Sequence, residues 1–302
     1  MQRHPSAPGE RPAPATGDRR LASVNQADGP RDSAPLDVPA LLAAYDAQLR
    51  ARIPDPLPAR LKVDRDGPLV RFEMPKGGFV GYRDLGGLEG AELDALIERQ
   101  VRFFAERGKR FEWKHHGHDL PTDLPARLRA AGFVPEDIET VEVARVADVA
   151  AVPVLPEGVS LREVTARGDF DRIAAFETEI WQDDHIDLVD MFESERAADP
   201  GSITILVVEA AGDVVCAAWM RFEPGTEFAT LWGGATLPAW RGRGIYRATV
   251  AYRANLAADR GFRFLEVDSS PDSRPILERL GFVPVTTTTP YTWSPAPPNP
   301  GP

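Results

Sequence analysis

A four-residue sequence that occurs twice constrains the fold of this chain more than any other feature. Gly-Phe-Val-Pro stands at residues 132–135 and again at 281–284. A similar block precedes each copy, Ala-Glu-Arg-Gly from residue 105 and Ala-Asp-Arg-Gly from residue 258, and a short helix-like run lies between block and copy. Self-similarity at such a long period indicates a duplicated domain rather than a solenoid. The 302 residues suit two domains of about 130 residues each, plus tails.

The composition suggests where these domains begin and end. Residues 1–36 are rich in Pro, Ala, Gly, Ser and Arg with almost no large apolar residues, so we expect a disordered tail. Residues 294–302 form a second, proline-rich tail, and two prolines between the copies mark a linker. We therefore predict a first domain at 37–148 and a second domain at 158–293.

A glycine-rich turn between a strand and a helix is the strongest functional signal. Residues 237–246 read Leu-Pro-Ala-Trp-Arg-Gly-Arg-Gly-Ile-Tyr, after a strand-like run and before a run with apolar or small residues at helical spacing. The first N–H groups of a helix have no intrahelical partner, and the helix dipole adds partial positive charge. An anion, most naturally a phosphate, binds at such a place. The two glycines let a ligand approach the backbone closely, and the two arginines add positive charge.

The spacing of this turn resembles the pyrophosphate-binding loop of the GCN5-related N-acetyltransferases, which bind acetyl-CoA. Arg241, Gly244 and Pro238 match the family's pattern, whereas Tyr246 stands where the family usually has Gly or Ala. The elements that follow also come in the family's order: helix, strand, a helix that we expect Ser270 to cap, Gly-Phe, and strand. The resemblance implies an α/β fold with two tandem acetyltransferase-like domains, each a mixed sheet flanked by helices.

The resemblance also implies acetyl-CoA as co-substrate. The residues implied to bind it lie at the end of the strand before the loop, in the loop, and before the next helix: Ala235, Thr236, Leu237, Arg241, Gly242, Arg243, Gly244, Ile245, Tyr246 and Ser270. The corresponding turn of the first copy, at 84–91, has no arginine and carries Asp84 and Glu89. We therefore expect a degenerate first copy and one acetyl-CoA per chain.

Direct acetyl transfer needs an unprotonated amine, a polarised thioester carbonyl and a proton for the leaving thiolate. A backbone N–H near Ala235 can polarise the carbonyl, and the Gly-Gly pair before it is expected to mark a bulge or a close backbone approach. For the base, the resemblance points to Glu227 at the start of that strand. Asp184 and His185 lie in the segment that usually walls the acceptor site in the family. A solvated surface position explains each of these three side chains equally well.

The proton donor for the thiolate is missing from its usual place. The family often has a tyrosine four residues before the final glycine of the motif, and this chain has Leu277 there. Tyr246, Ser270 and Ser273 are nearby substitutes. The leading hypothesis is an N-acetyltransferase acting on a primary amine of a small molecule or peptide. The alternative is a non-catalytic acyl-CoA-binding or regulatory protein.

Charge and composition limit the partners and the compartment. The formal net charge of −11 argues against nucleic-acid or anionic-membrane partners, and no apolar run is long enough for a spanning helix. The lone cysteine, Cys216, excludes an intramolecular disulfide and fits a cytoplasmic protein. His115, His116 and His118 resemble a metal cluster, but their spacing does not establish convergent ligands, so we predict no metal site. The chain is expected to be a monomer or homodimer.

Overall fold

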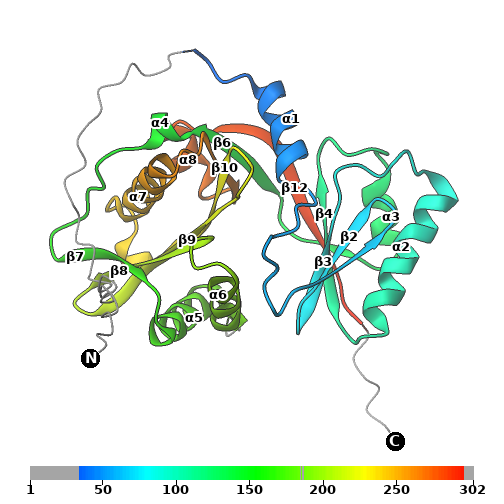
Figure 1. The fold of residues 1–302 in the computed structure, drawn as a ribbon, viewed down its shortest axis with the longest axis horizontal. Helices are drawn as coiled ribbons and strands as arrows, with labels where there is room; N and C mark the ends of the chain where they lie inside the picture. The colour runs from blue at the N-terminus through cyan, green and yellow to red at the C-terminus, as the bar shows by residue number, and fades with distance from the viewer. Residues whose placement is uncertain (1–33, 184, 186, 296–302) are drawn as a thin grey trace, which may run out of the picture.

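The computed structural model describes residues 34–183, 185 and 187–295. A twelve-stranded sheet runs through both halves of the molecule, in the order β1-β2-β3-β4-β12-β6-β11-β10-β9-β8-β7, with β5 paired to β12 (Figure 1). The predicted α/β class, with a mixed sheet flanked by helices, is confirmed. The predicted tails at 1–36 and 294–302 lie mostly outside the described residues.

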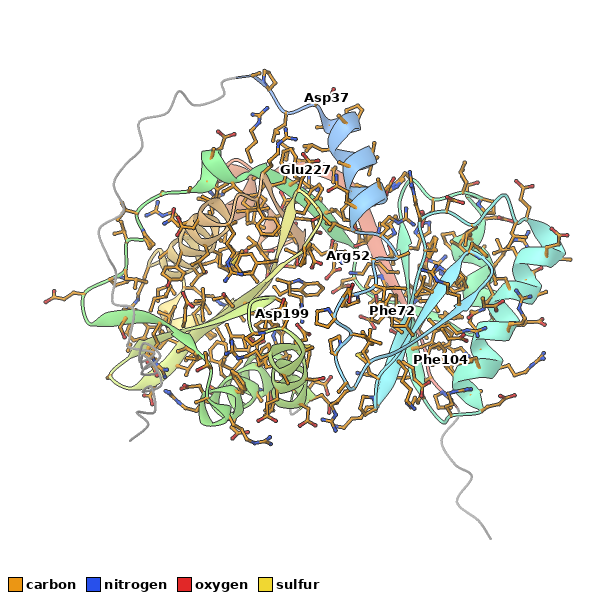
Figure 2. The ribbon with its side chains drawn as sticks, in the orientation of Figure 1. Asp37, Arg52, Phe72, Phe104, Asp199 and Glu227 are labelled. Carbon is orange, nitrogen blue, oxygen red and sulfur yellow. The ribbon has the colours of Figure 1, made fainter. Side chains whose placement is uncertain are left out.

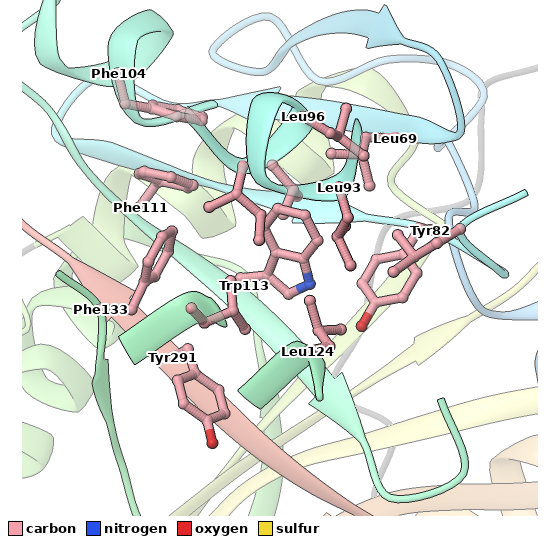
Figure 3. Packing of buried hydrophobic residues seen from close by; sticks show 14 residues of the cluster. Leu69, Tyr82, Leu93, Leu96, Phe104, Phe111, Trp113, Leu124, Phe133 and Tyr291 are labelled. Atoms are coloured by element: carbon pink, nitrogen blue, oxygen red, sulfur yellow. The ribbon is translucent and has the colours of Figure 1, made fainter. Parts of the chain in front are cut away.

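The first half of the chain forms one end of the sheet. Apolar residues at helical spacing form α2 (Gly90–Ala105), which buries Leu93, Leu96 and Phe104 against the strands. Figure 3 shows Trp113 among the aromatic and leucine side chains of this core. The other elements are α1 (Val38–Gln48), β1 (Lys62–Asp66), β2 (Leu69–Glu73), β3 (Gly77–Gly81), β4 (Arg110–His116), α3 (Leu124–Ala130), β5 (Val134–Pro135), β6 (Glu139–Arg145) and α4 (Val146–Val149).

The second half forms the other end of the sheet. Its elements are β7 (Val159–Val164), α5 (Arg167–Trp181), α6 (Asp187–Ala198), β8 (Ile203–Ala210), β9 (Asp213–Phe222), β10 (Phe228–Thr236), the 3₁₀ turn η1 (Pro238–Trp240), α7 (Ile245–Asp259), β11 (Phe264–Ser269), α8 (Arg274–Arg279) and β12 (Val283–Trp293). Within the described ranges, no helix combines the length and the apolar character needed to cross a membrane.

The helices cover the two faces of the sheet unequally. We call the face that carries α1, α5 and α6 the front face, and the face that carries α7 and α8 the back face (Figure 1). Side chains alternate between the faces along each strand. On β9, Trp219 therefore packs with α5 and α6, whereas its neighbour Met220 packs with α7 and α8. On β6, Val143 packs with α1 on the front face and Ala144 lies on the back face.

The two halves exchange strands in the middle of the sheet. β6 comes from the first half of the chain, yet it lies between β11 and β12, the last two strands of the second half. The last residues of β12, from Thr288 to Trp293, pair in turn with β4 and β5 of the first half. Each half therefore contains a strand that the other half supplies, and the predicted division of the chain at 148–158 stays a prediction.

Candidate functional site

The glycine-rich loop joins β10 to α7 with a backbone that only glycine adopts readily. Gly242 has φ +73° and Gly244, which precedes the first residue of α7, has φ +83°. A Cβ atom at Gly242 would meet nothing within 4 Å, and one at Gly244 would meet only Arg247 Nη2 at 3.7 Å. The backbone conformation, rather than crowding, therefore calls for glycine, and space remains over the free N–H groups at the start of α7.

The two arginines of the loop contact neutral groups, so their positive charges can act on a ligand. Arg241 donates from Nε to the carbonyl oxygen of Thr236 at 3.0 Å, and the guanidinium of Arg243 lies 4.7 Å from the ring centre of Trp240. Neither arginine forms an ion pair with a carboxylate of the described residues. The loop therefore combines two uncompensated cations with the positive end of the α7 dipole, which is the arrangement that favours a phosphate.

Strand β10 parts from β11 just before the loop. The two parallel strands pair only as far as Thr230 opposite Glu266, and β11 then continues to Ser269 paired with β6. Beyond this point the edge of β10 that faced β11 lacks a strand partner. The expected bulge is present, because the register between β10 and β9 shifts between Gly233 and Ala235. This leaves backbone N–H and C=O groups of β10 open to a ligand with peptide-like amides.

Both glycines of the bulge are required by close contacts. Gly233 has φ +64°, and a Cβ atom there would lie 2.5 Å from the ring of Trp219 on the front face. Gly234 has φ +94°, and a Cβ atom there would lie 2.6 Å from the ring of Tyr246 on the back face. The Tyr246 side chain therefore packs against the sheet, and burial raises the pKa of its phenol.

A buried arginine of α7, which the sequence did not reveal, holds the bulge of β10 in place through hydrogen bonds to backbone carbonyl groups. Arg253 of α7 is 1% exposed, and its Nη1 donates to the carbonyl oxygens of Trp219 at 3.0 Å and Trp232 at 3.1 Å. Its Nε donates to the carbonyl oxygen of Thr249 at 3.1 Å, whereas Nη2 has no partner among the described residues. The signal in the sequence was an arginine on the inward side of a helix, where an apolar residue is usual.

The remaining predicted ligands of acetyl-CoA flank the loop. Ala235 and Leu237 pack toward the core beneath α5, and Ile245 is buried below the loop. The Thr236 hydroxyl is buried without a partner among the described residues. The prediction that Ser270 caps the next helix is wrong: α8 begins at Arg274, and the Ser270 hydroxyl instead accepts from the backbone N–H of Ser273 at 3.3 Å. Residues 271–273 form a turn, in which the N–H of Ser273 donates to the carbonyl oxygen of Ser270 at 3.1 Å and closes a tighter loop than that of an α-helix.

The three predicted catalytic residues do not come together at the loop, and one of them lies outside the residues that the structure describes. Glu227 lies at the start of β10, where it forms an ion pair with Arg263 and accepts from Gln48 Nε2 at 3.0 Å (Figure 2). The hydrogen bond from Gln48 and the charge of Arg263 lower the pKa of the Glu227 carboxyl. The backbone N–H of His185 donates to Thr178 Oγ1 at 3.2 Å, and its buried Nε2 has no partner among the described residues. Asp184 lies outside the described residues.

Two other carboxyl groups are buried in the second half, one of them at the parting of β10 and β11. Glu266 ends the paired stretch, is 7% exposed, and forms no hydrogen bond or ion pair with any residue in the described ranges. Burial, together with the charge of Asp268, raises the pKa of the Glu266 carboxyl well above its usual value. Glu177 of α5 is 3% exposed, and burial raises the pKa of its carboxyl to about 7. A charged residue amid the apolar run of a strand was the available signal for Glu266.

The histidines and the cysteine have structural surroundings. His116 Nε2 lies 3.1 Å from the hydroxyl of Tyr45, and His118 Nδ1 lies 2.8 Å from Thr286 Oγ1. No group of three or more His, Cys, Asp or Glu side chains that could hold a metal ion occurs within the part of the chain that the structure describes. Cys216 is fully buried, and burial raises the pKa of its thiol to about 11, which opposes a nucleophilic role.

The sequence and the fold are similar to those of known acetyltransferases. Residues 169–282 match the sequence model of the acetyltransferase (GNAT) family. No curated protein has a matching sequence. A GCN5-related N-acetyltransferase from Kribbella flavida has 17% identity and a TM-score of 0.60, over 86% of this chain and 95% of its own.

Two further solved structures share the fold. A tandem GNAT protein from the clavulanic acid biosynthesis pathway has 17% identity and a TM-score of 0.57, over 90% of this chain and 92% of its own. A GCN5-related N-acetyltransferase from Sphaerobacter thermophilus has 16% identity and a TM-score of 0.56, over 78% and 82%. Residues 169–282 therefore resemble the acetyltransferase (GNAT) family in sequence, and the chain shares its fold with a tandem GNAT protein.

Proposed function

We propose that the chain is an N-acetyltransferase that moves an acetyl group from acetyl-CoA directly to a primary amine of a small molecule or peptide. The observation that carries the proposal is the parting of β10 from β11 at a glycine bulge, next to the cationic loop that opens α7. A phosphate on the loop and an amide-containing arm along the free edge of β10 would bring a thioester to the bulge. The backbone N–H groups there can then polarise its carbonyl.

Several features of the first half support one acetyl-CoA per chain. Its turn at 84–91 carries Asp84, whose carboxylate accepts from the backbone N–H of Gly86 at 2.8 Å and so occupies a donor that a phosphate would need. Glu89 adds a second negative charge at the start of α2. An anion is repelled from such a turn, whereas the loop before α7 attracts it.

The proposal includes partners and compartment. The net charge of −11 speaks against nucleic acid or an anionic membrane surface as a partner, and the free, buried Cys216 is consistent with a reducing cytoplasm. We propose a monomer or homodimer, with no resident metal.

A matched pair of glycine variants tests the cofactor. Gly244→Val should abolish the rise in Tm that millimolar acetyl-CoA causes in the parent protein, because a side chain would cover the loop backbone. Gly225→Val is the control, since Gly225 has φ +77° in the β9–β10 turn and open space around it, so the backbone strain is comparable. A parent protein whose Tm does not move with acetyl-CoA would disprove the assignment.

One observation favours the alternative of a non-catalytic acyl-CoA-binding or regulatory protein. Leu277 of α8, at the place where the family often has a tyrosine, is fully buried in the core and offers no proton. Release of free CoA from acetyl-CoA in the presence of amines separates the two functions. An enzyme releases CoA faster with an amine than in buffer, whereas a binding protein shows the Tm shift alone.

A further inference from the structure

The front face between α1 and α6 carries an unpaired carboxylate at the point where β10 and β11 part. We propose that this face binds the acceptor as a compact organic dication with primary amino groups, and that Glu266 and Asp268 hold its ammonium groups. This inference rests on the acetyl-transfer function proposed above and names the substrate class of the same site.

Glu266 is the first observation. Its side chain lies on the front face, because Phe264, two residues earlier on β11, packs with α1. Asp119, a buried acid of the first half, is paired: it accepts from Arg50 at 2.7 Å and from Tyr82 at 2.5 Å. Glu142 is buried on the back face with both carboxyl oxygens unpartnered among the described residues, but Glu266 is the one at the parting of β10 and β11. A carboxyl group that is 93% buried and has no partner in the described residues is costly to ionise, so a ligand that supplies a cation would stabilise its charged form.

Asp268, two residues further along β11, is the second observation. One of its oxygens accepts from Lys114 Nζ at 2.7 Å, whereas the other, Oδ1, is buried without a partner among the described residues. Lys114 Nζ also lies 3.4 Å from Glu139 Oε2, and the charge of Glu112 acts on it as well. Carboxylates therefore outnumber cations around Asp268, and the excess negative charge favours a second positive group on the ligand.

An exposed aromatic side chain provides the apolar part of the site. Trp232 follows Thr230 on the front face of β10, is 44% exposed, and donates from Nε1 to the Thr230 hydroxyl at 2.8 Å. Because Thr230 is the partner of Glu266 across the two strands, the indole and the carboxylate belong to neighbouring positions. The guanidinium of Arg221 already lies 4.8 Å from the centre of the indole ring, so the exposed part of the ring offers the ligand an apolar surface on which an aliphatic chain can pack.

The first half of the chain contributes to this face. Tyr45 of α1 is close enough to Asp268 and Glu266 for both charges to raise the pKa of its phenol, although burial raises it most. Arg60 and Lys76 form ion pairs with Asp190 and Asp187 of α6, the second at 2.9 Å. The site therefore needs both halves, which gives the degenerate copy a role in acceptor binding.

Acetyl transfer at this site needs no separate acid to protonate the leaving thiolate. An ammonium group gives one proton to the Glu266 carboxylate, whose burial makes it a stronger base. The amine nitrogen then forms a bond to the thioester carbonyl carbon, and the C–S bond breaks with its electron pair going to sulfur. The nitrogen loses its second proton to the thiolate, and Glu266 later releases its proton to solvent.

Three compounds of equal chain length test the substrate class: 1,4-diaminobutane, 1-aminobutane and 4-aminobutanoate. We expect kcat/KM for CoA release to fall in that order, by roughly tenfold or more at each step. Glu266→Gln should reduce kcat with the diamine by about a hundredfold or more. Glu193→Gln, which changes a half-buried acid of α6 that is paired with Arg167, should leave kcat unchanged.

Two variants that remove charges of opposite sign distinguish an effect of charge from an effect of damage to the fold. Asp268→Asn should reduce the preference for the diamine over the monoamine by roughly tenfold, whereas Lys114→Gln should increase it. Acetyl-CoA binding by each variant, measured as a Tm shift, reports separately on the proposed function. Calorimetric titration of 1,4-diaminobutane into the protein without acetyl-CoA should show binding that Glu266→Gln weakens.

The outcomes that overturn the inference are distinct from those that overturn the function. If the monoamine or 4-aminobutanoate reacts as fast as the diamine, or if the diamine does not bind in calorimetry, the dication is wrong even though acetyl-CoA binds. If Asp268→Asn and Lys114→Gln change the preference in the same direction, charge at this face does not select the acceptor.

Discussion

At the scale of single residues, the protein places ionisable groups in the interior without the usual partners. Arg253 has no carboxylate to balance it and instead donates to the two carbonyl oxygens that flank the bulge. Burial lowers the pKa of its guanidinium. Since a buried donor that loses its acceptors is costly, the carbonyl oxygens and the arginine hold each other in place. The bulge in β10 is thus determined by a side chain of α7 as well as by its own glycines.

Glu177 gives a prediction on pH and stability. Its folded pKa of about 7 lies above the value of 4.5 for an exposed glutamate, so its contribution to stability is full below pH 4.5 and is lost as the pH rises to about 7. The Glu177→Gln variant has no titrating group at this position, so it does not lose this stability as the pH rises. The free energy of unfolding of the variant, relative to the parent, should therefore increase by about 2 kcal/mol between pH 5 and 7 and change little above pH 8.

Urea denaturation at pH 5, 6, 7 and 8 measures this difference. Glu193→Gln serves as control, because Glu193 is only half-buried and should show no such trend. A difference between Glu177→Gln and the parent that does not vary with pH would contradict the burial of an ionisable carboxyl.

The sequence predicts some of these residues and misses others for a physical reason. Gly242 and Gly244 are evident, because a left-handed backbone before a helix requires glycine and the requirement is local. Glu266 and Arg253 are not evident, because their meaning depends on which strands and helices face them. The same limit applies to Glu227, whose partner Gln48 lies far away in the sequence. Neighbouring residues determine the backbone conformation of a turn, whereas the partners of a buried charge depend on the tertiary fold.

At the scale of elements, β12 connects the two cores. Its first residues complete the sheet of the second half, and its last residues, including Tyr291, are buried in the core around Trp113 (Figure 3). The repeated Gly-Phe-Val-Pro sequence predicts two similar halves, but the exchange of β6 and β12 does not follow from it. Either strand could pair within its own half, and only the tertiary arrangement decides between the two.

A substitution in β12 tests this connection. Tyr291→Ala should destabilise the core of the first half by about 3 kcal/mol, because it removes a ring that is 2% exposed. Hydrogen exchange should rise in β4 and α3 together with β12. Thr292→Ala is the control on the same strand, since Thr292 makes an exposed hydrogen bond to Glu136. Loss of protection confined to β10 and β11 would contradict the assignment of Tyr291 to the first core.

At the scale of the whole molecule, we propose that one half binds the anion, while elements of both halves cover the front face. Calorimetry should therefore give one acetyl-CoA per chain, because the loop before α7 carries two arginines without carboxylate partners among the described residues, whereas the corresponding turn at 84–91 carries Asp84. Arg241→Ala together with Arg243→Ala should weaken binding by roughly tenfold or more. Asp84→Asn, the control in the first half, should leave the stoichiometry at one. Two equivalent sites would show that the turn at 84–91 also binds.

The exchange of β6 and β12 also has a consequence for synthesis on the ribosome. A nascent chain that has emerged as far as residue 145 contains β6 but not the strands on either side of it, and it contains β4 without its neighbour β12. Neither core can close until β12 leaves the exit tunnel, so the two halves complete their folding together rather than domain by domain. A stop codon that removed only β12 would therefore leave both cores incomplete, including the one made almost wholly from earlier residues.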